Sequence, residues 1–135
     1  MITLKRGVVA VAVFGLCACS KPEPINETHQ GVIEDGDHTL STDQSKYDEY
    51  SFRAAEGMQI TLTMSSTAVD SYVHLIDKDG NQLVHDDDSG GGANGRDARV
   101  TFTAAYTGEY KAYANTAGAA ERGAYSLVIN TVAGH

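Results

Sequence analysis

The chain has 135 residues, and its 18 Asp or Glu outnumber 10 Lys or Arg, which gives a net charge of −8. An acidic surface repels phosphate backbones and anionic lipid head groups, so we expect no nucleic-acid partner and no electrostatic docking on a membrane. At this length one domain is expected, with a core large enough to fold without disulfides.

The N-terminal segment has the features of an export signal. Lys5 and Arg6 precede a short apolar run that ends in Leu16-Cys17-Ala18-Cys19. A membrane-spanning helix needs about 20 apolar residues, so this shorter run indicates a cleaved signal peptide. Its end resembles the lipobox of bacterial lipoproteins, which implies that residues 1–18 are removed and Cys19 is acylated. The alternative is an ordinary secretory signal that is cut elsewhere.

The resemblance to lipoproteins also implies a location. An acylated Cys19 anchors the chain in a membrane of the cell envelope, and Ser20 after it, rather than Asp, implies the outer membrane, with the domain facing the periplasm or the cell surface. Residues 19–30 are polar and contain both prolines of the chain, so we interpret them as a tether. The folded domain is then expected over residues 31–135.

After the tether, apolar and polar residues alternate in short runs separated by glycine and aspartate, which is typical of β-strands. Met58, Ile60, Leu62 and Met64 share one face of such a run, and no segment has a helical period. The pattern predicts an all-β antiparallel sandwich or barrel, with Tyr110 and Tyr125 as its buried tyrosines. The predicted strands are residues 47–54, 58–64, 72–76, 99–104, 108–115 and 124–131.

An ordered series of short motifs runs through the predicted domain: Asp48-Glu49-Tyr50-Ser51-Phe52, Glu56-Gly57-Met58, the segment 70–77, Gly80, Asp86-Asp87-Asp88, Thr107-Gly108-Glu109-Tyr110 and Gly123-Ala124-Tyr125-Ser126-Leu127. From about Gly31 to Asn130 the chain resembles the bacterial pre-peptidase C-terminal domain, which is related to the collagen-binding modules of clostridial collagenases. The resemblance implies a single, jelly-roll-like antiparallel β-sandwich that follows the signal and the tether. It also implies a noncatalytic binding module.

The sequence has no motif with catalytic context. HExxH, GxSxG, a phosphate-binding glycine loop and a CxxC pair are all absent from the sequence. Its five histidines are scattered, and we expect His74 and His85 at surface or strand-edge positions rather than as metal ligands. We therefore expect that the protein is not an enzyme.

The acidic, glycine-rich segment 86–97 is the candidate metal site. Asp86, Asp87 and Asp88 are consecutive, and carboxylates with free backbone carbonyls are the hard oxygen ligands that calcium prefers. Asp70 and Asp97 are the further candidate ligands. The alternative is a solvated hairpin loop whose charges protect a sheet edge. The segment 77–81 begins like an EF-hand loop but lacks the required Glu, so we predict a β-turn with Gly80 at positive φ.

Exposed tyrosines are the candidate ligand-binding residues: Tyr47, Tyr106 and Tyr113 suit stacking on a sugar or holding a peptide. The alternative is that these residues are present because tyrosine forms strands well. Two functions stay open. The first is an adhesion or binding module for a protein, peptide or polysaccharide, which an aromatic row on an exposed face favours. The second is a structural, chaperone-like or inhibitory partner of a secreted protease, which an open edge strand on a bare polar surface favours.

The calcium hypothesis predicts that the ion stabilises the domain. A ligand that binds only the native state adds about 2.7 kcal/mol at a hundredfold excess over its dissociation constant, enough to raise the melting temperature by roughly ten degrees. Thermal melting with millimolar calcium and with chelator measures this shift. The rise should disappear in Asp86→Ala or Asp88→Ala, and an unchanged melting temperature would leave the segment as a solvated loop.

Overall fold

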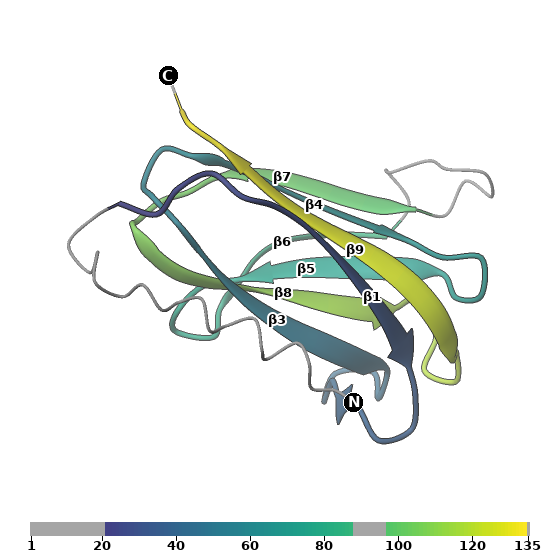
Figure 1. Cartoon of the computed structure of the whole chain (residues 1–135). Helices are drawn as coiled ribbons and strands as arrows, with labels where there is room; N and C mark the ends of the chain where they lie inside the picture. The colour runs from purple at the N-terminus through teal and green to yellow at the C-terminus, as the bar shows by residue number, and fades with distance from the viewer. Residues whose placement is uncertain (1–20, 88–96, 135) are drawn as a thin grey trace.

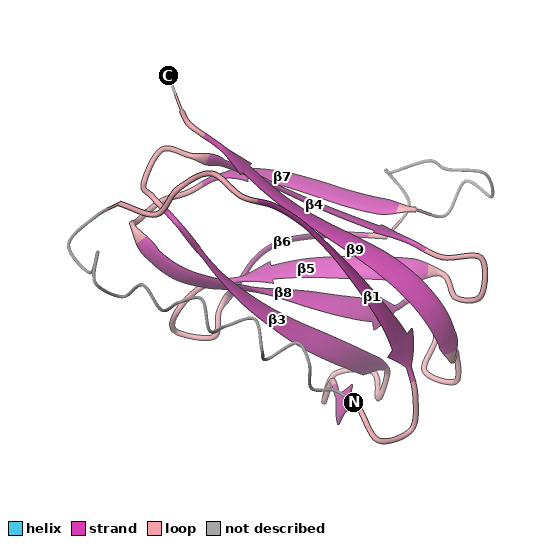
Figure 2. Cartoon of the chain, in the orientation of Figure 1, coloured by secondary structure: helices cyan, strands magenta, loops and turns pink. Residues whose placement is uncertain are grey.

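In a computed structural model, residues 21–87 and 97–134 form an antiparallel β-sandwich (Figures 1 and 2). The strands in these residues are β1 (Asn26–Ile33), β2 (His38–Thr39), β3 (Lys46–Ala54), β4 (Gln59–Ser65), β5 (Ser71–Ile76), β6 (Gln82–Asp86), β7 (Ala98–Thr103), β8 (Gly108–Thr116) and β9 (Gly123–Val132). The all-β prediction is confirmed. The described part of the chain contains no helix long and apolar enough to cross a membrane.

The strands form two sheets that face each other. One sheet has four strands in the order β1-β9-β4-β7, and the other has five in the order β2-β3-β8-β5-β6. All pairings between neighbours are antiparallel. In Figure 1 the chain crosses repeatedly between the two layers, with β1 and β9 side by side in one and β3, β8 and β5 in the other. Each sheet therefore has one face toward the core and one toward solvent.

The core is built from the inward faces of both sheets, as the alternation in the sequence predicts. Strand β4 supplies Ile60, Leu62 and Met64, all fully buried, and Met58 before it is also buried. From the opposite sheet, Phe52 stacks on Tyr110, with 5.9 Å between the ring centroids. Aliphatic and aromatic side chains thus fill the space between the layers, where burial of apolar surface stabilises the fold.

The two tyrosines predicted to be buried are buried, and each hydroxyl has a partner at the rim of the core. The Tyr110 hydroxyl donates to the backbone oxygen of Tyr106 (2.7 Å) and accepts from its backbone N–H (3.1 Å). This link, from the start of a strand to the backbone four residues upstream, is the tyrosine corner of β-sandwich folds. It fixes the path of the chain into β8.

Strand β1 corrects the predicted tether. Residues 26–30 belong to β1, which pairs with β9 from Asn26↔Asn130 to Ile33↔Gly123, and Ile25 also bonds to Thr131. As an edge strand, β1 buries only Ile33 completely, so its sequence lacks the apolar alternation that identified the other strands. The tether is therefore shorter than predicted. Strands β2 and β6, both at sheet edges, were missed for the same reason.

All the strands and all the core residues of the described structure lie between Ile25 and Val132. A chain that begins at Ser20 therefore contains every strand and core residue of the described structure, and we expect it to fold.

Gly31 provides a stringent test of how the sheets pack. A Cβ at Gly31 would overlap the Tyr125 hydroxyl and ring. Two hydrogen bonds hold the Tyr125 side chain in place, because its hydroxyl donates to Asp48 (2.5 Å) and accepts from Tyr50 (2.5 Å). We expect Gly31→Ala to lower the free energy of unfolding by about 1–3 kcal/mol in urea denaturation, as overpacking does. Gly36→Ala is the matched control, since a Cβ at Gly36 meets nothing within 4 Å. Equal stability of the two variants would contradict the packing.

Candidate ligand-binding face

The outward face of the five-stranded sheet, here called the outer face, carries a continuous row of aromatic side chains. Every strand of this sheet contributes at least one ring, and the row consists of His38, Tyr47, Tyr113, His74, Tyr72 and His85. Strand pairing sets the row, because His85, His74 and Tyr113 lie opposite one another on three adjacent strands. The rings touch along the whole width of the sheet.

Two of the three predicted ligand-binding tyrosines meet within this row. The rings of Tyr47 and Tyr113 are stacked with centroids 4.3 Å apart, and both side chains are half-buried. Burial and the neighbouring Tyr113 raise the pKa of Tyr47, so its hydroxyl stays protonated at neutral pH. The two stacked rings form one aromatic unit on the outer face.

His74 lies at the centre of the row and is only 6% exposed, which corrects the expectation of a surface or strand-edge position. It faces outward, but Tyr72, Tyr113 and His85 surround its ring. Strand β5 is also an inner strand of the sheet. His85, in contrast, is exposed on the edge strand β6, as predicted, and its Nδ1 lies 3.0 Å from the Tyr72 hydroxyl.

The side chain of Asn115, which is fully buried, orients the ring of His74. Its amide nitrogen donates to the backbone oxygen of Lys46 (2.8 Å) and to Ser45 Oγ (2.9 Å), so its oxygen must face His74. That oxygen lies 3.1 Å from Nε2 of His74. Because a carbonyl oxygen only accepts, Nε2 carries a proton. On the other side of the ring, Nδ1 lies 2.6 Å from Oε1 of Gln82.

The loop between β2 and β3 lies beside this network and is held by its own hydrogen bonds. The Leu40 N–H donates to the Ser45 oxygen, and the Gln44 N–H donates to the Leu40 oxygen (both 2.8 Å). Asp43 accepts from the backbone N–H and the hydroxyl of Ser45. These two bonds lower the pKa of Asp43. Gln44 has φ of +67°, which costs about 1–3 kcal/mol and persists only where surrounding contacts impose it.

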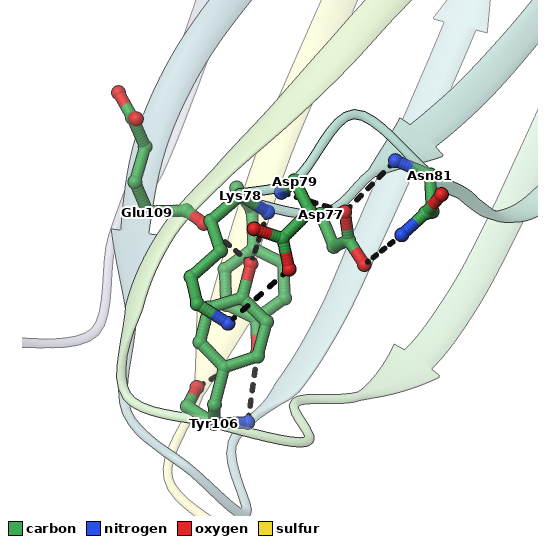
Figure 3. A network of polar contacts seen from close by, with 7 residues as sticks. Asp77, Lys78, Asp79, Asn81, Tyr106 and Glu109 are labelled. Atoms are coloured by element: carbon green, nitrogen blue, oxygen red, sulfur yellow. Dashed lines mark hydrogen bonds and ion pairs between the residues drawn. The ribbon is translucent and has the colours of Figure 1, made fainter.

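Tyr106 lies apart from the aromatic row, in the turn before β8 (Figure 3). Its hydroxyl donates to the Glu109 oxygen (2.6 Å) and accepts from the Lys78 N–H (2.7 Å), while its ring stacks on Tyr110 at 4.3 Å. The Lys78 ammonium also lies over this ring. Tyr106 therefore holds two turns together, and as a ligand-binding residue it stays a prediction.

The segment 77–81 is the predicted β-turn. Gly80 has φ of +88°, and the Asp77 carboxylate accepts from the backbone N–H groups of Asp79 and Asn81, both at 2.8 Å (Figure 3). These bonds lower the pKa of Asp77. The Asp77 side chain is thus used within the turn.

The predicted calcium ligands come from three strand ends. Asp86 ends β6, where its Oδ2 accepts from the Arg99 N–H (3.0 Å); Asp97 immediately precedes β7, and Asp70 immediately precedes β5. Asp87 is exposed, and Asp88 lies outside the described residues, as does Cys19. Within residues 21–87 and 97–134, no group of three or more His, Cys, Asp or Glu is placed to hold a metal. Calcium binding stays a prediction.

The comparisons with known proteins concern the same part of the chain. Residues 46–116, more than half of the sequence, match the model of the family described as the bacterial pre-peptidase C-terminal domain. The chain belongs to this family. The match extends from β3 to the end of β8, so it includes five of the six residues of the aromatic row. A search of curated proteins finds no significant match.

Solved structures share the fold of this pre-peptidase C-terminal domain. The domain of Bacillus anthracis collagenase has 23% sequence identity and a TM-score of 0.55, with 82% of this chain and 98% of that chain covered. PliG of Aeromonas hydrophila, a periplasmic lysozyme inhibitor of g-type lysozyme, has 10% identity and a TM-score of 0.55, with 82% and 88% covered. PliG of Salmonella Typhimurium, also a periplasmic inhibitor of g-type lysozyme, has 20% identity and a TM-score of 0.52, with 79% and 87% covered.

A second polar cluster, centred on Asp48, lies where β3 faces β9. Tyr125 donates to Asp48, and Tyr50 donates in turn to Tyr125. Burial raises the pKa of Asp48 to about 6, and the nearby carboxylates Asp37 and Glu34 act in the same direction, whereas the hydrogen bond from Tyr125 opposes the change. A groove of about 640 Å³ opens beside it. The sequence motif of Asp48 to Phe52 contained this carboxylate but gave no sign of its burial.

The Asp48 cluster predicts a pH dependence of stability. The pKa is 3.8 for an unperturbed Asp and about 6 in the fold, so the folded domain binds this proton more tightly. The contribution of Asp48 to the free energy of unfolding is fully present below about pH 4 and is lost as the pH rises through about 6. We expect Asp48→Asn to remove this decline, measured as urea midpoints across the range. Asp43→Asn is the control. Hydrogen bonds lower the pKa of Asp43, so its contribution to stability is lost as the pH falls, and removing it should leave the decline in place. A decline that Asp48→Asn leaves intact would contradict the assignment.

Proposed function

We propose that the protein is a noncatalytic binding module of the bacterial cell envelope, and that it binds a protein, peptide or polysaccharide through the outer face of its five-stranded sheet. The observation that carries this proposal is the aromatic row, which spans all five strands. Tyrosine presents a large, rigid and amphipathic surface at low entropic cost, and it is enriched among residues that dominate binding energy. A row of this kind favours adhesion over a purely structural role.

The proposal includes attachment to the outer membrane through an acylated Cys19. The lipobox resemblance of residues 16–19 supports it, and so does the family, because pre-peptidase C-terminal domains accompany secreted proteins. The described fold begins at Ile25, so only a short segment separates the proposed anchor from the domain. Cys19→Ser should abolish incorporation of a labelled fatty acid into the full chain, and labelling of this variant would refute the anchor.

Inhibition of a secreted enzyme is the second candidate function. The likeness to two periplasmic inhibitors of g-type lysozyme favours it. At sequence identities of 10% and 20%, this likeness concerns the fold alone. The strand edges of the sandwich suit this role as well, because the outer edges of β6 and β7 have no strand partner in the described structure.

Cosedimentation tests the proposed function. The chain from Ser20 is mixed with collagen fibres, insoluble chitin or insoluble cellulose, and the bound fraction is measured. We expect at least one of these materials to bind the domain, and we expect Tyr47→Ala with Tyr113→Ala to weaken that binding about tenfold or more, as loss of a central aromatic pair does. Thr101→Ala with Thr103→Ala, on exposed positions of the opposite sheet, is the control.

Three outcomes would count against the proposal. The first is that the wild-type chain binds none of the materials, and the second is that its binding survives loss of both tyrosines. The third is that the domain inhibits g-type lysozyme and that loss of both tyrosines leaves this inhibition unchanged. The third outcome would assign the chain to the second function.

A further inference from the structure

A pocket of about 370 Å³ lies on the outer face, between the aromatic row and the loop that joins β2 to β3. The stacked rings of Tyr47 and Tyr113 line it together with His74. The opposite wall is formed by Thr39 of β2 with Ser41 and Thr42 of the loop. Gln82 lines the pocket from the edge strand β6. The volume is within the range of pockets that hold one small ligand.

The pocket is preorganised. Its loop wall is held by the backbone bonds from Leu40 to Ser45 and from Gln44 to Leu40, and by the Asp43 carboxylate, which accepts from Ser45. Its imidazole is fixed from behind by Asn115, which also bonds to the backbone of Lys46 at the end of the loop. Because these groups are already ordered, a ligand loses little free energy in ordering them.

The lining combines the rings of Tyr47 and Tyr113 with hydroxyl and amide groups. Hydroxyls of Thr39, Ser41 and Thr42 and the amide of Gln82 are able both to donate and to accept hydrogen bonds. No Asp, Glu, Lys or Arg is among the described residues that line it. A carboxylate, phosphate or ammonium ligand would find no opposite charge among these hydroxyl and amide groups, and the Lys46 ammonium beside them is already bonded to Thr39 (2.7 Å). The net charge of −8 repels anions further.

We propose that this pocket is a subsite for one neutral pyranose ring of a polysaccharide. A pyranose has a C–H face that carries partial positive charge, which the negative face of an aromatic ring attracts, and a rim of hydroxyls that needs neutral donors and acceptors. The inference rests on the proposed function and names its ligand class. It makes the rings of Tyr47 and Tyr113 the apolar wall that the sugar contacts, and it makes the hydroxyls of Thr39, Ser41 and Thr42 and the amide of Gln82 the groups that orient the sugar.

A peptide fits this pocket less well. An extended peptide gains much of its affinity by adding main-chain hydrogen bonds at an open strand edge. Beside the pocket that edge is occupied, because β2 pairs with Tyr47 and Lys46 of β3. The Lys46 ammonium also bonds to Thr39 across the same two strands (2.7 Å). On the side of β3, the pocket thus offers a ligand side chains rather than free backbone groups.

Calorimetric titration of the chain from Ser20 with defined tetrasaccharides tests the inference. The neutral probes are cellotetraose, chitotetraose and maltotetraose, and the anionic probe is tetragalacturonic acid. We expect one neutral probe to bind and the anionic probe not to bind. Tyr113→Ala should weaken binding about tenfold or more, and Tyr113→Phe, which keeps the ring, should stay within about twofold. Thr42→Ala should weaken binding, whereas Thr101→Ala on the opposite sheet should not.

The outcomes separate this inference from the proposed function. Failure of all three neutral tetrasaccharides would overturn the sugar subsite, and collagen binding that depends on Tyr113 would then leave the proposed function in place. Sugar binding that Tyr113→Ala leaves unchanged would show that the sugar binds outside this pocket. Preferential binding of tetragalacturonic acid would overturn the neutral ligand class.

Discussion

The outer face depends on the hydrogen bonds made by the buried side chain of Asn115. This one amide joins three segments: its own strand β8, His74 on β5 and the backbone at the end of the loop before β3. Each of its polar atoms has a partner, and a buried polar group that loses its partner costs about 1–3 kcal/mol. Asn115 thus fixes the ring of His74 and the position of the loop together. The aromatic row and the pocket wall have a common support.

The rest of the sandwich provides a rigid frame for that face. Tyr110 anchors the turn before β8 from within the core, and Tyr106 ties the same turn to the turn after β5. Strands β8 and β5, which carry Tyr113 and His74, are therefore held at one end by these turns and at the other by the Asn115 network. Rigid strands position binding side chains more accurately than loops do. This arrangement explains how a small domain can present an ordered aromatic surface.

The sequence predicted the parts of the fold in which one face of a strand is buried. The alternation of Ile60, Leu62 and Met64 identified β4, and the same period identified five further strands. Edge strands such as β1 bury too few residues to show this period. The site was harder to predict. Tyr47 and Tyr113 were recognised as ligand-binding candidates, but their contact depends on strand order, which a single sequence does not reveal. The burial of His74 depends on the rings of Tyr72, Tyr113 and His85, which strand pairing brings around it.

The central claim is that ligands bind the outer face of the five-stranded sheet, and site-specific photo-crosslinking in living cells tests it most directly. Benzoylphenylalanine replaces Tyr113 in the full chain, and in a second strain it replaces Thr101 on the opposite sheet. Benzophenone inserts into C–H bonds of proteins and polysaccharides alike, so the readout does not depend on the ligand class. The account predicts an adduct of higher mass from position 113 and none from position 101. Adducts from position 101 alone would contradict it.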